Sequence, residues 1–298
     1  MTRLAARRGA VALPPQVLLL GSIASVQFGA GIAVRLFDQA GPGGVVLMRL
    51  LLSGALLWAI ARPRLRGRSR AAIAAAVGFG LILGTMNWSF YEALDRLPLG
   101  VAVTIEFLGP LVVALAGSRQ ALDLLWIVLA GVGVALLTLH GDNSRVTLAG
   151  VLLALVAAAC WAAYILLSQR VGAEFEALDG LAISLAVASL VVLPVGLVQG
   201  GAALLRPGVL AGGLAVAMLS SLIPYSLEII ALRRLSASTF GLLMSLQPAF
   251  GALAGVIVLG QSLTVVMVVA IVMVVLASIG TTVYSRRPPP RMPAQGPK

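Results

Sequence analysis

The sequence predicts an all-α polytopic membrane protein with ten transmembrane helices, arranged as two inverted repeats of five. The first observation is composition, because 60% of the 298 residues are hydrophobic and only 10% are charged, whereas a soluble domain carries about 25% charged residues. The second is spacing, because the charges cluster between apolar runs of roughly 20 residues, the length that spans a bilayer as a helix. The third is an internal repeat between the two halves of the chain.

Short joints that carry charge, proline or glycine separate the apolar runs. We expect transmembrane helices at residues 15–37, 42–61, 71–91, 98–117, 122–140, 147–168, 178–199, 208–229, 236–258 and 262–284. Residues 1–14 then form a cytoplasmic N-terminal segment. The proline-rich, basic tail at residues 285–298 is predicted to be disordered.

The distribution of arginine and lysine predicts the orientation. With the N-terminus inside, the cytoplasmic segments hold sixteen of these residues and the outer joints hold four. The densest patch, RPRLRGRSR at residues 62–70, lies between two spans and has no interleaved aromatic residues, so no nucleic-acid partner is expected. The positive-inside rule therefore puts both termini in the cytoplasm.

The internal repeat aligns two segments of 19 residues. ALDRLPLGVAVTIEFLGPL, residues 93–111, lies over ALRRLSASTFGLLMSLQPA, residues 231–249, at an offset of 138, which places Pro110 opposite Pro248. Because each half holds an odd number of spans, the second half must enter the membrane with the opposite orientation. Inverted repeats are typical of secondary transporters, whose halves rock around a shared site.

Rare residues exclude several classes of function. The only lysine is Lys298, so the chain has no P-loop lysine for ATP-driven work. The single histidine, His140, and the single cysteine, Cys160, leave no cluster of metal ligands, no CxxC pair and no intrachain disulfide. A membrane-embedded enzyme would need a reactive set near one face. The sequence therefore predicts no enzyme, no cofactor and no metal site.

Two charged residues lie inside apolar spans. Glu106 lies near the middle of its span, and Arg49 lies at similar depth in another span that runs in the same direction. A buried charge costs roughly 2.5 kcal/mol or more on insertion scales, which favours a functional role. The two residues could form a structural ion pair. Alternatively, Arg49 holds a substrate carboxylate while Glu106 takes an amine or a proton.

Two prolines are predicted to interrupt matching spans. Pro110 follows Glu106 by four residues, and Pro248 directly follows Gln247. Interrupted helices at matching places in inverted halves indicate the binding site of a transporter. The alternative is that the prolines only bend packed helices.

Further polar and aromatic residues within apolar spans are candidate substrate ligands. With Arg49, Glu106 and Gln247, the predicted substrate-binding residues are Gln27, Asn87, Trp88, Trp161, Tyr164, Tyr225 and Ser245. The two tryptophans could equally serve packing. Proton coupling is assigned to Glu106, and Glu228, at the cytoplasmic end of its span, is a second candidate.

Two long segments of the chain are similar to a known family. MNWSFYEALDRLPLGVAVTIEFLGPLVVAL, residues 86–115, and IPYSLEIIALRRLSASTFGLLMSLQPAFGALAGVIVLGQSLT, residues 223–264, resemble the EamA branch of the drug/metabolite transporter superfamily. Within that branch, the chain looks closest to the bacterial inner-membrane threonine/homoserine exporters. The positions that carry this likeness are Gln27, Arg49, Asn87, Glu106, Trp161, Tyr164 and Glu228.

The resemblance implies two EamA repeats of five helices, at residues 15–140 and 147–284, in the bacterial inner membrane. It also implies export of small amino acids or related metabolites by proton antiport, with a zwitterionic metabolite, protons and the lipid bilayer as partners. The alternative is efflux of drugs or other small metabolites on the same fold. Family members often carry Glu before the second proline and in a following G-E-T/S-L motif, where this chain has Gln247 and Gln261.

Overall fold

The structure is a computed structural model that describes residues 13–63, 68–116, 122–140, 146–175, 177–232, 234–235 and 237–284. Within these residues, every regular element is a helix. The predicted N-terminal segment, 1–14, lies almost wholly outside the described residues, and the predicted disordered tail, 285–298, lies wholly outside them.

The first half of the chain forms six helices. These are α1 Pro15–Arg35, α2 Phe37–Ala61, α3 Arg70–Leu94, α4 Leu99–Glu106, α5 Leu108–Ala116 and α6 Leu122–His140. Helix α3 begins where the Ser69 hydroxyl accepts a hydrogen bond from the Ala72 amide at 3.0 Å. Helix α2 starts five residues earlier than the predicted span and is kinked at Gly41, whose positive φ of 64° precedes Pro42.

The second half forms seven α-helices and two short helices of other types. They are α7 Leu148–Glu174, α8 Ala177–Gly200, the 3₁₀-helix Gly201–Leu205, α9 Pro207–Ala217, the π-helix Met218–Leu222, α10 Ile223–Leu232, α11 Ala237–Met244, α12 Gln247–Leu259 and α13 Val265–Tyr284. The Thr147 hydroxyl caps α7, and Gly260, at φ 64°, ends α12. Each of three predicted spans therefore consists of consecutive shorter helices and not of one continuous helix. These spans are 98–117, 208–229 and 236–258.

Eight helical stretches of the described residues are long and apolar enough to cross a membrane. Each overlaps one of the predicted spans. The other two predicted spans, 122–140 and 262–284, correspond to helices α6 and α13. The chain is thus a multi-pass helical membrane protein, and the count of ten spans stays a prediction.

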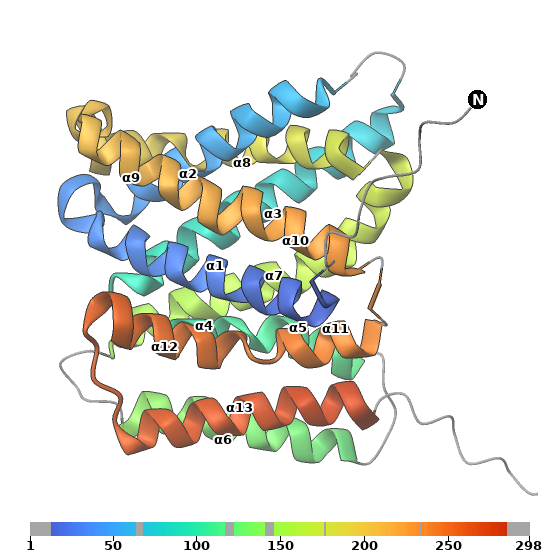
Figure 1. Cartoon of the computed structure of the whole chain (residues 1–298), viewed down its shortest axis with the longest axis vertical. Helices are drawn as coiled ribbons and strands as arrows, with labels where there is room; N and C mark the ends of the chain where they lie inside the picture. Colours follow the sequence, from blue (N-terminus) through green and yellow to red (C-terminus); the bar gives the residue numbers. More distant parts are fainter. Residues whose placement is uncertain are drawn as a thin grey trace, which may run out of the picture.

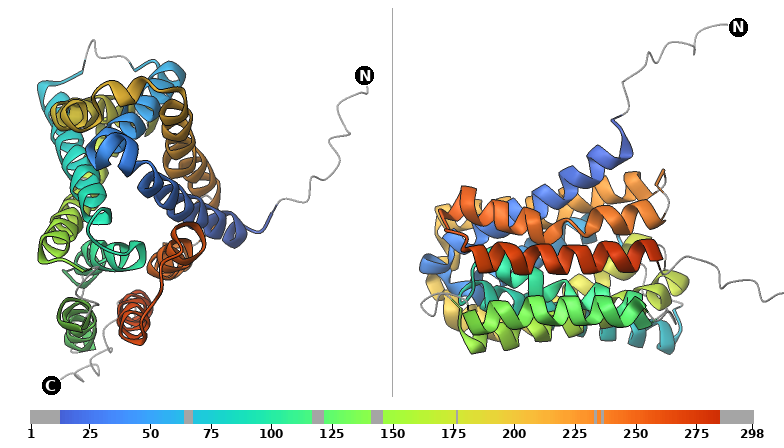
Figure 2. Two further views of the ribbon diagram at one scale, coloured as in Figure 1. Left: turned by 90° about the vertical axis from the view of Figure 1, so that its left-hand side faces the viewer. Right: turned by 90° about the horizontal axis from the view of Figure 1, so that it is seen from below.

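The helices run side by side and form a ring when the bundle is viewed from one end, with α6 and α13 set to one side (Figures 1 and 2). Helix α2 packs against α8, α3 against α7, α1 against α10, α4 against α12, and α6 against α13. Each of these pairs joins one half of the chain to the other, so the two halves share one core.

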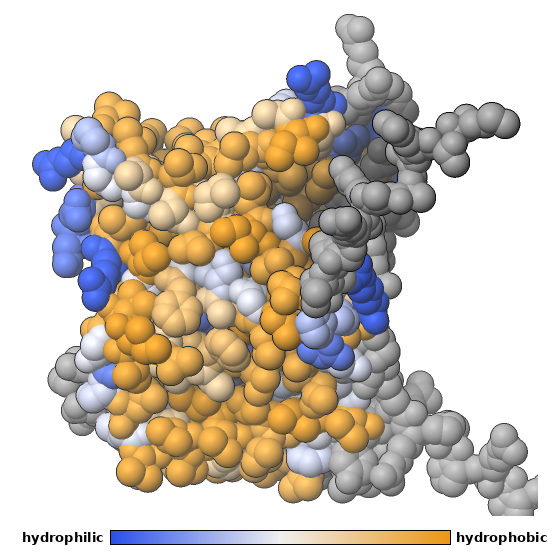
Figure 3. Space-filling view, in the orientation of Figure 1, coloured by the Kyte–Doolittle hydropathy of each residue, from blue (hydrophilic) through white to orange (hydrophobic). Residues whose placement is uncertain are grey.

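Apolar side chains cover the outer surface of the bundle. Figure 3 shows them over one face, with hydrophilic residues gathered at the two edges where the helices end. Large side chains such as Leu190, Val198 and Leu152 are more than half exposed. An apolar belt of this size is too large for the surface of a soluble protein and matches the hydrocarbon core of a bilayer.

Polar residues tie the two halves together at one end of the bundle. Gln199 accepts a hydrogen bond from the Gly43 amide at 2.6 Å and donates one to Glu92 at 2.8 Å. Arg96 pairs with the same carboxylate at 2.7 Å. Glu92 is only 5% exposed, but its charge is compensated, so it has a structural setting.

Candidate functional site

Two helices end at the same distance before a proline. Helix α4 ends at Glu106, four residues before Pro110, and α11 ends at Met244, four residues before Pro248. Proline has no N–H, so the carbonyl four residues earlier loses its helical partner. The backbone therefore breaks at Phe107 in the first half and at residues 245–246 in the second.

A third interruption lies between α9 and α10. Pro224 cannot donate to the Ser220 carbonyl, and the chain there forms the π-helix Met218–Leu222. The Ser220 carbonyl accepts a hydrogen bond from Arg49 Nη2 at 3.1 Å, and the Leu219 carbonyl accepts one from the Ser25 hydroxyl at 2.7 Å. Side chains from α1 and α2 thus satisfy two carbonyls of this π-helix.

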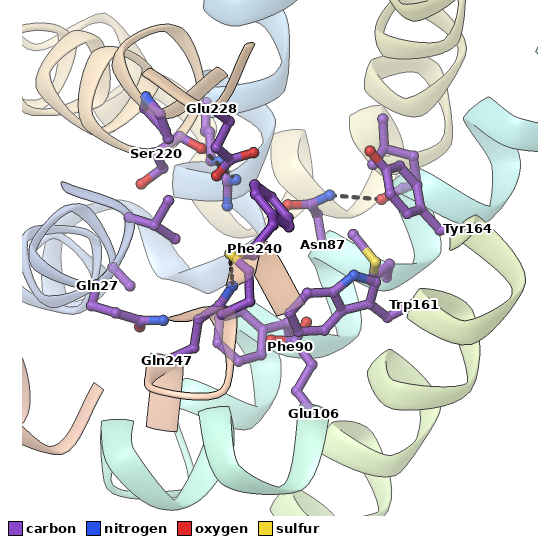
Figure 4. Close-up of a pocket in the computed structure, with 17 residues that line it drawn as sticks. Gln27, Asn87, Phe90, Glu106, Trp161, Tyr164, Ser220, Glu228, Phe240 and Gln247 are labelled. Atoms are coloured by element: carbon purple, nitrogen blue, oxygen red, sulfur yellow. Dashed lines mark hydrogen bonds between the residues drawn. The ribbon is translucent and has the colours of Figure 1, made fainter. Parts of the chain in front are cut away.

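The three interruptions meet at one cavity of about 260 Å³ inside the bundle (Figure 4). Eight of the predicted site residues line it: Gln27, Arg49, Asn87, Glu106, Trp161, Tyr164, Glu228 and Gln247. They come from helices α1, α2, α3, α4, α7, α10 and α12, and therefore from both halves of the chain. A cavity shared between halves is the arrangement expected of a transporter with a central site.

Arg49 is held at the cavity wall by its neighbours. Its Nη1 donates to the Tyr91 hydroxyl at 3.3 Å, and its guanidinium lies 5.6 Å from the centre of the Tyr91 ring. Its Nη2 donates to the Ser220 carbonyl. Tyr91 is fully buried, so these contacts give the cation a defined position.

Two carboxylates face the same cavity. The sequence placed Glu228 at the end of its span, but the structure puts it on the cavity wall, where it accepts a hydrogen bond from the buried Ser22 hydroxyl at 2.7 Å. In Figure 4, Glu228 lies on the side of Ser220, and Glu106 lies on the opposite side. Among the described residues, no hydrogen bond to the Glu106 carboxylate is found. The cavity therefore offers acidic groups at two separate places.

Aromatic rings form part of the wall. Trp161 on α7 meets Phe107 edge-on, with ring centres 5.7 Å apart, and Tyr164 stacks on Phe79 at 4.7 Å. Asn87 donates to the Leu83 carbonyl at 2.8 Å, and Figure 4 shows its side chain pointing toward Tyr164. These contacts fix the rotamers of the wall, which favours a preformed site.

Comparison with known proteins identifies the family. Residues 148–283 match the EamA-like transporter family. The chain is 45% identical over 277 residues to the threonine/homoserine exporter RhtA of Salmonella typhimurium (strain LT2), covering 92% of this chain and 93% of that protein. It is 46% identical over 275 residues to the protein of the same name from Escherichia coli (strain K12), covering 92% of each. The chain belongs to the EamA-like transporter family.

A solved structure supports the fold of this EamA-family chain. One solved crystal structure of a protein superposes on this chain with a TM-score of 0.60. The superposition covers 90% of this chain and 96% of the chain in the crystal structure. Its sequence is 18% identical, so the likeness bears on the fold alone.

Two predicted site residues of this transporter, Trp88 and Ser245, are not among the described residues that line the cavity. Trp88 packs against the hydrophobic core, and its indole nitrogen is buried. Ser245 is fully buried and shares a 2.8 Å hydrogen bond with Ser278 of α13, so it braces the break after α11. The side chain of Tyr225 lies outside the described residues.

The lining residues that the sequence reasoning missed include Phe90, Ser220, Phe240 and Met244. Helical spacing offers a signal for two of them, because Phe90 follows Asn87 by three residues and Met244 precedes Gln247 by three. Pro224 offers a signal for Ser220, whose carbonyl it cannot bond. Phe240 lies one helical turn before Met244.

Proposed function

We propose that this protein exports small zwitterionic amino acids, such as threonine and homoserine, across the bacterial inner membrane in exchange for protons. The observation that carries the proposal is one intramembrane cavity that presents the Arg49 cation and the carboxylates of Glu106 and Glu228. The names of the two relatives, both threonine/homoserine exporters, support this class of substrate.

Opposite charges in one cavity suit a zwitterion. The planar guanidinium of Arg49 fits the substrate carboxylate, with which it can form two parallel hydrogen bonds. The substrate ammonium then needs an acceptor, and Glu106 and Glu228 are the cavity carboxylates. The cavity volume of about 260 Å³ is large enough for a small amino acid between these charged side chains.

The same carboxylates suit proton exchange. An uncompensated charge buried away from water is costly, so a cavity carboxylate favours having either a proton or the substrate ammonium. If the two compete for Glu106, arrival of the substrate displaces the proton, and departure of the substrate lets a proton bind. Exchange of one for the other follows from this competition.

The architecture we propose is two inverted repeats, ten spans and cytoplasmic termini. The repeat is supported by helix bounds, since α11 begins and ends 138 residues after α4, the offset of the sequence repeat. It is also supported by reciprocal packing, because α3 contacts α7 as α1 contacts α10, and α3 contacts α8 as α2 contacts α9. Two such halves can rock around the shared cavity.

The test uses purified protein in liposomes with labelled threonine or homoserine inside or outside. We expect an imposed pH gradient to drive accumulation and a protonophore to abolish it. Transport that ignores the gradient would overturn the antiport. Movement of amphipathic cations, without movement of either amino acid, would favour the drug-efflux alternative.

A further inference from the structure

Two glutamine carboxamides face the cavity in addition to its charged groups. Gln27 comes from α1 and Gln247 from the first turn of α12, and they are 3% and 9% exposed. Figure 4 shows both side chains directed into the cavity from neighbouring positions. The two glutamines therefore form a neutral polar part of the cavity wall. The charged part consists of Arg49, Glu106 and Glu228.

The packing between α1 and α12 brings these carboxamides close. Gly251 lies one turn after Gln247, and a Cβ added there would lie 3.5 Å from Gln27 Oε1 and 3.0 Å from a methyl group of Val103. The glycine thus lets α12 pack closely on Val103, with the Gln27 carboxamide at ordinary contact distance from Gly251. Helix α1 contacts α12 along this region, so the relative position of the two glutamines is set by helix packing.

Both carboxamides have unused hydrogen-bonding capacity. Among the described residues, no hydrogen bond is found for the Gln27 side chain, and that of Gln247 contacts only the Met244 sulfur, at 3.7 Å. Thioether sulfur is a weak acceptor, whereas a carboxamide offers two donors and an acceptor. Buried polar groups are nearly always hydrogen-bonded, and these two carboxamides face the cavity, so their remaining donors and acceptors are open to a ligand there.

The charged groups cannot select among amino acids. Arg49, Glu106 and Glu228 address the carboxylate and the ammonium, which all amino acids share. Selection must therefore come from groups that contact the substrate side chain. A hydroxyl is both donor and acceptor, and a carboxamide complements it in both respects.

Building on the proposed function, we infer that Gln27 and Gln247 form a subsite for the hydroxyl of the transported amino acid. Threonine carries its hydroxyl on Cβ and homoserine on Cγ. Two long amide side chains from different helices can serve both positions. An amino acid without the hydroxyl leaves the amides unsatisfied when it fills the cavity, and the site then rejects it.

One analogue tests this inference for both substrates. Replacing the hydroxyl of threonine or of homoserine by hydrogen gives the same compound, 2-aminobutyrate. We would measure the concentration of each that halves uptake of labelled threonine into proteoliposomes. We expect wild-type protein to require roughly tenfold more 2-aminobutyrate than threonine, the effect of leaving buried polar groups unpaired.

Gln27→Leu and Gln247→Leu should narrow the ratio of the two half-inhibiting concentrations to about twofold or less. The hydroxylated substrates then lose a hydrogen bond, and 2-aminobutyrate no longer leaves that amide unpaired. Gln39→Leu, at an exposed position of α2, is the matched control and should keep the wild-type ratio. If a leucine variant does not reach the membrane, Gln27→Asn and Gln247→Asn, which shorten the amide, should narrow the ratio partly.

The outcomes separate the two proposals. Wild-type protein that moves neither threonine nor homoserine overturns the proposed function and the subsite with it. Wild-type protein that moves both, but shows no preference over 2-aminobutyrate, overturns the subsite alone. Glutamine variants that retain the wild-type ratio do the same.

Discussion

The two broken helices share a backbone device but differ in their side chains. In both halves, a helix of eight residues ends four residues before a proline. The last residue is Glu106 in the first half and Met244 in the second. The second half instead has a neutral amide, Gln247, beside its proline. The backbone geometry is therefore symmetric, whereas the acidic group lies at only one of the two breaks.

The two helix breaks also differ in their packing and hydrogen-bond contacts. Phe107 at the first break packs edge-on against Trp161 of the other half, and Gly109 lets α5 approach the Ala158 carbonyl closely. At the second break, Ser245 bonds to Ser278 of the same half. At the first break, Phe107 and Gly109 pack on the other half, whereas the hydrogen bond of Ser245 at the second break stays within its own half. The acid at the first break therefore lies where the two halves of the chain pack against each other.

The comparison requires that the halves run in opposite directions, and labelling tests this with an all-or-none result. Single cysteines at Arg70 and Gly208, in a Cys160→Ala background, occupy exposed positions in a predicted inner joint and a predicted outer joint. We expect an impermeant thiol reagent on intact cells to label the Gly208→Cys protein only. Gly208 has nothing within 4 Å of an added Cβ, so the substitution is tolerated. Labelling of both positions would contradict the inverted arrangement.

Removing the single acid at the breaks should have the largest effect on activity. Glu106→Gln keeps the shape of the side chain but cannot exchange a proton. We expect pH-driven export to fall by about two orders of magnitude, within the range of removing a group needed for proton transfer. Exchange of labelled for unlabelled threonine at equal concentrations should persist, because it needs no net proton movement.

Proton flux on adding substrate to proteoliposomes measures this directly. Glu174→Gln, at an exposed carboxylate near the end of α7, is the matched control. Wild-type flux in the Glu106→Gln protein would show that the carboxylate is structural. The acid at the first break would then be a packing feature, and the asymmetry between the breaks would have no bearing on coupling.

The fold was largely predictable because apolar runs of about 20 residues indicate transmembrane helices. The sequence could not show where these helices break. Pro110 and Pro248 were visible, but the break lies at the carbonyl that each proline leaves unbonded, about one turn earlier. Nor could it show that α2 begins before its kink, because Gly41 and Pro42 together resemble a joint.

The site was predictable where a residue was chemically out of place, as Glu106 and Arg49 are in apolar spans. It was less predictable where only the rotation of a helix decides. Asn87 and Trp88 are adjacent, so they point about 100° apart on a helix, and only Asn87 lines the cavity. In an apolar span, hydrophobic patterning does not separate a cavity-facing Phe240 from a lipid-facing side chain.

Arg49 extends the comparison because it brings a positive charge to the same cavity as Glu106, from helix α2. Arg49→Lys keeps the charge but loses the planar fork that fits a carboxylate. We expect normal amounts of protein in the membrane and an apparent substrate affinity weaker by roughly tenfold or more. Arg206→Lys, at an exposed position, is the control. Normal transport by both Arg49→Lys and Arg49→Gln would exclude the arginine as a substrate ligand.

The smallest expected effect is a partial rescue that tests whether the breaks are interchangeable. Gln247→Glu introduces a carboxylate at the second break, on the same cavity wall. In a Glu106→Gln background, this acid can exchange a proton, but it lies at the start of α12 and not at the end of α4, where Glu106 lies. We therefore expect pH-driven export to recover to only a few per cent to about a tenth of wild type, since a misplaced reacting group can cost up to about a hundredfold in rate.

The matched control for this rescue is Gln261→Glu in the same background. Gln261 accepts a hydrogen bond from the Leu99 amide at 3.0 Å and is not among the cavity residues, so an acid there should leave export at the level of Glu106→Gln alone. Equal recovery in the Gln247→Glu and Gln261→Glu proteins would mean that added charge, rather than its place, restores transport. Full recovery through Gln247→Glu would show that the two breaks are equivalent, and that the first break owes its role only to the residue it carries.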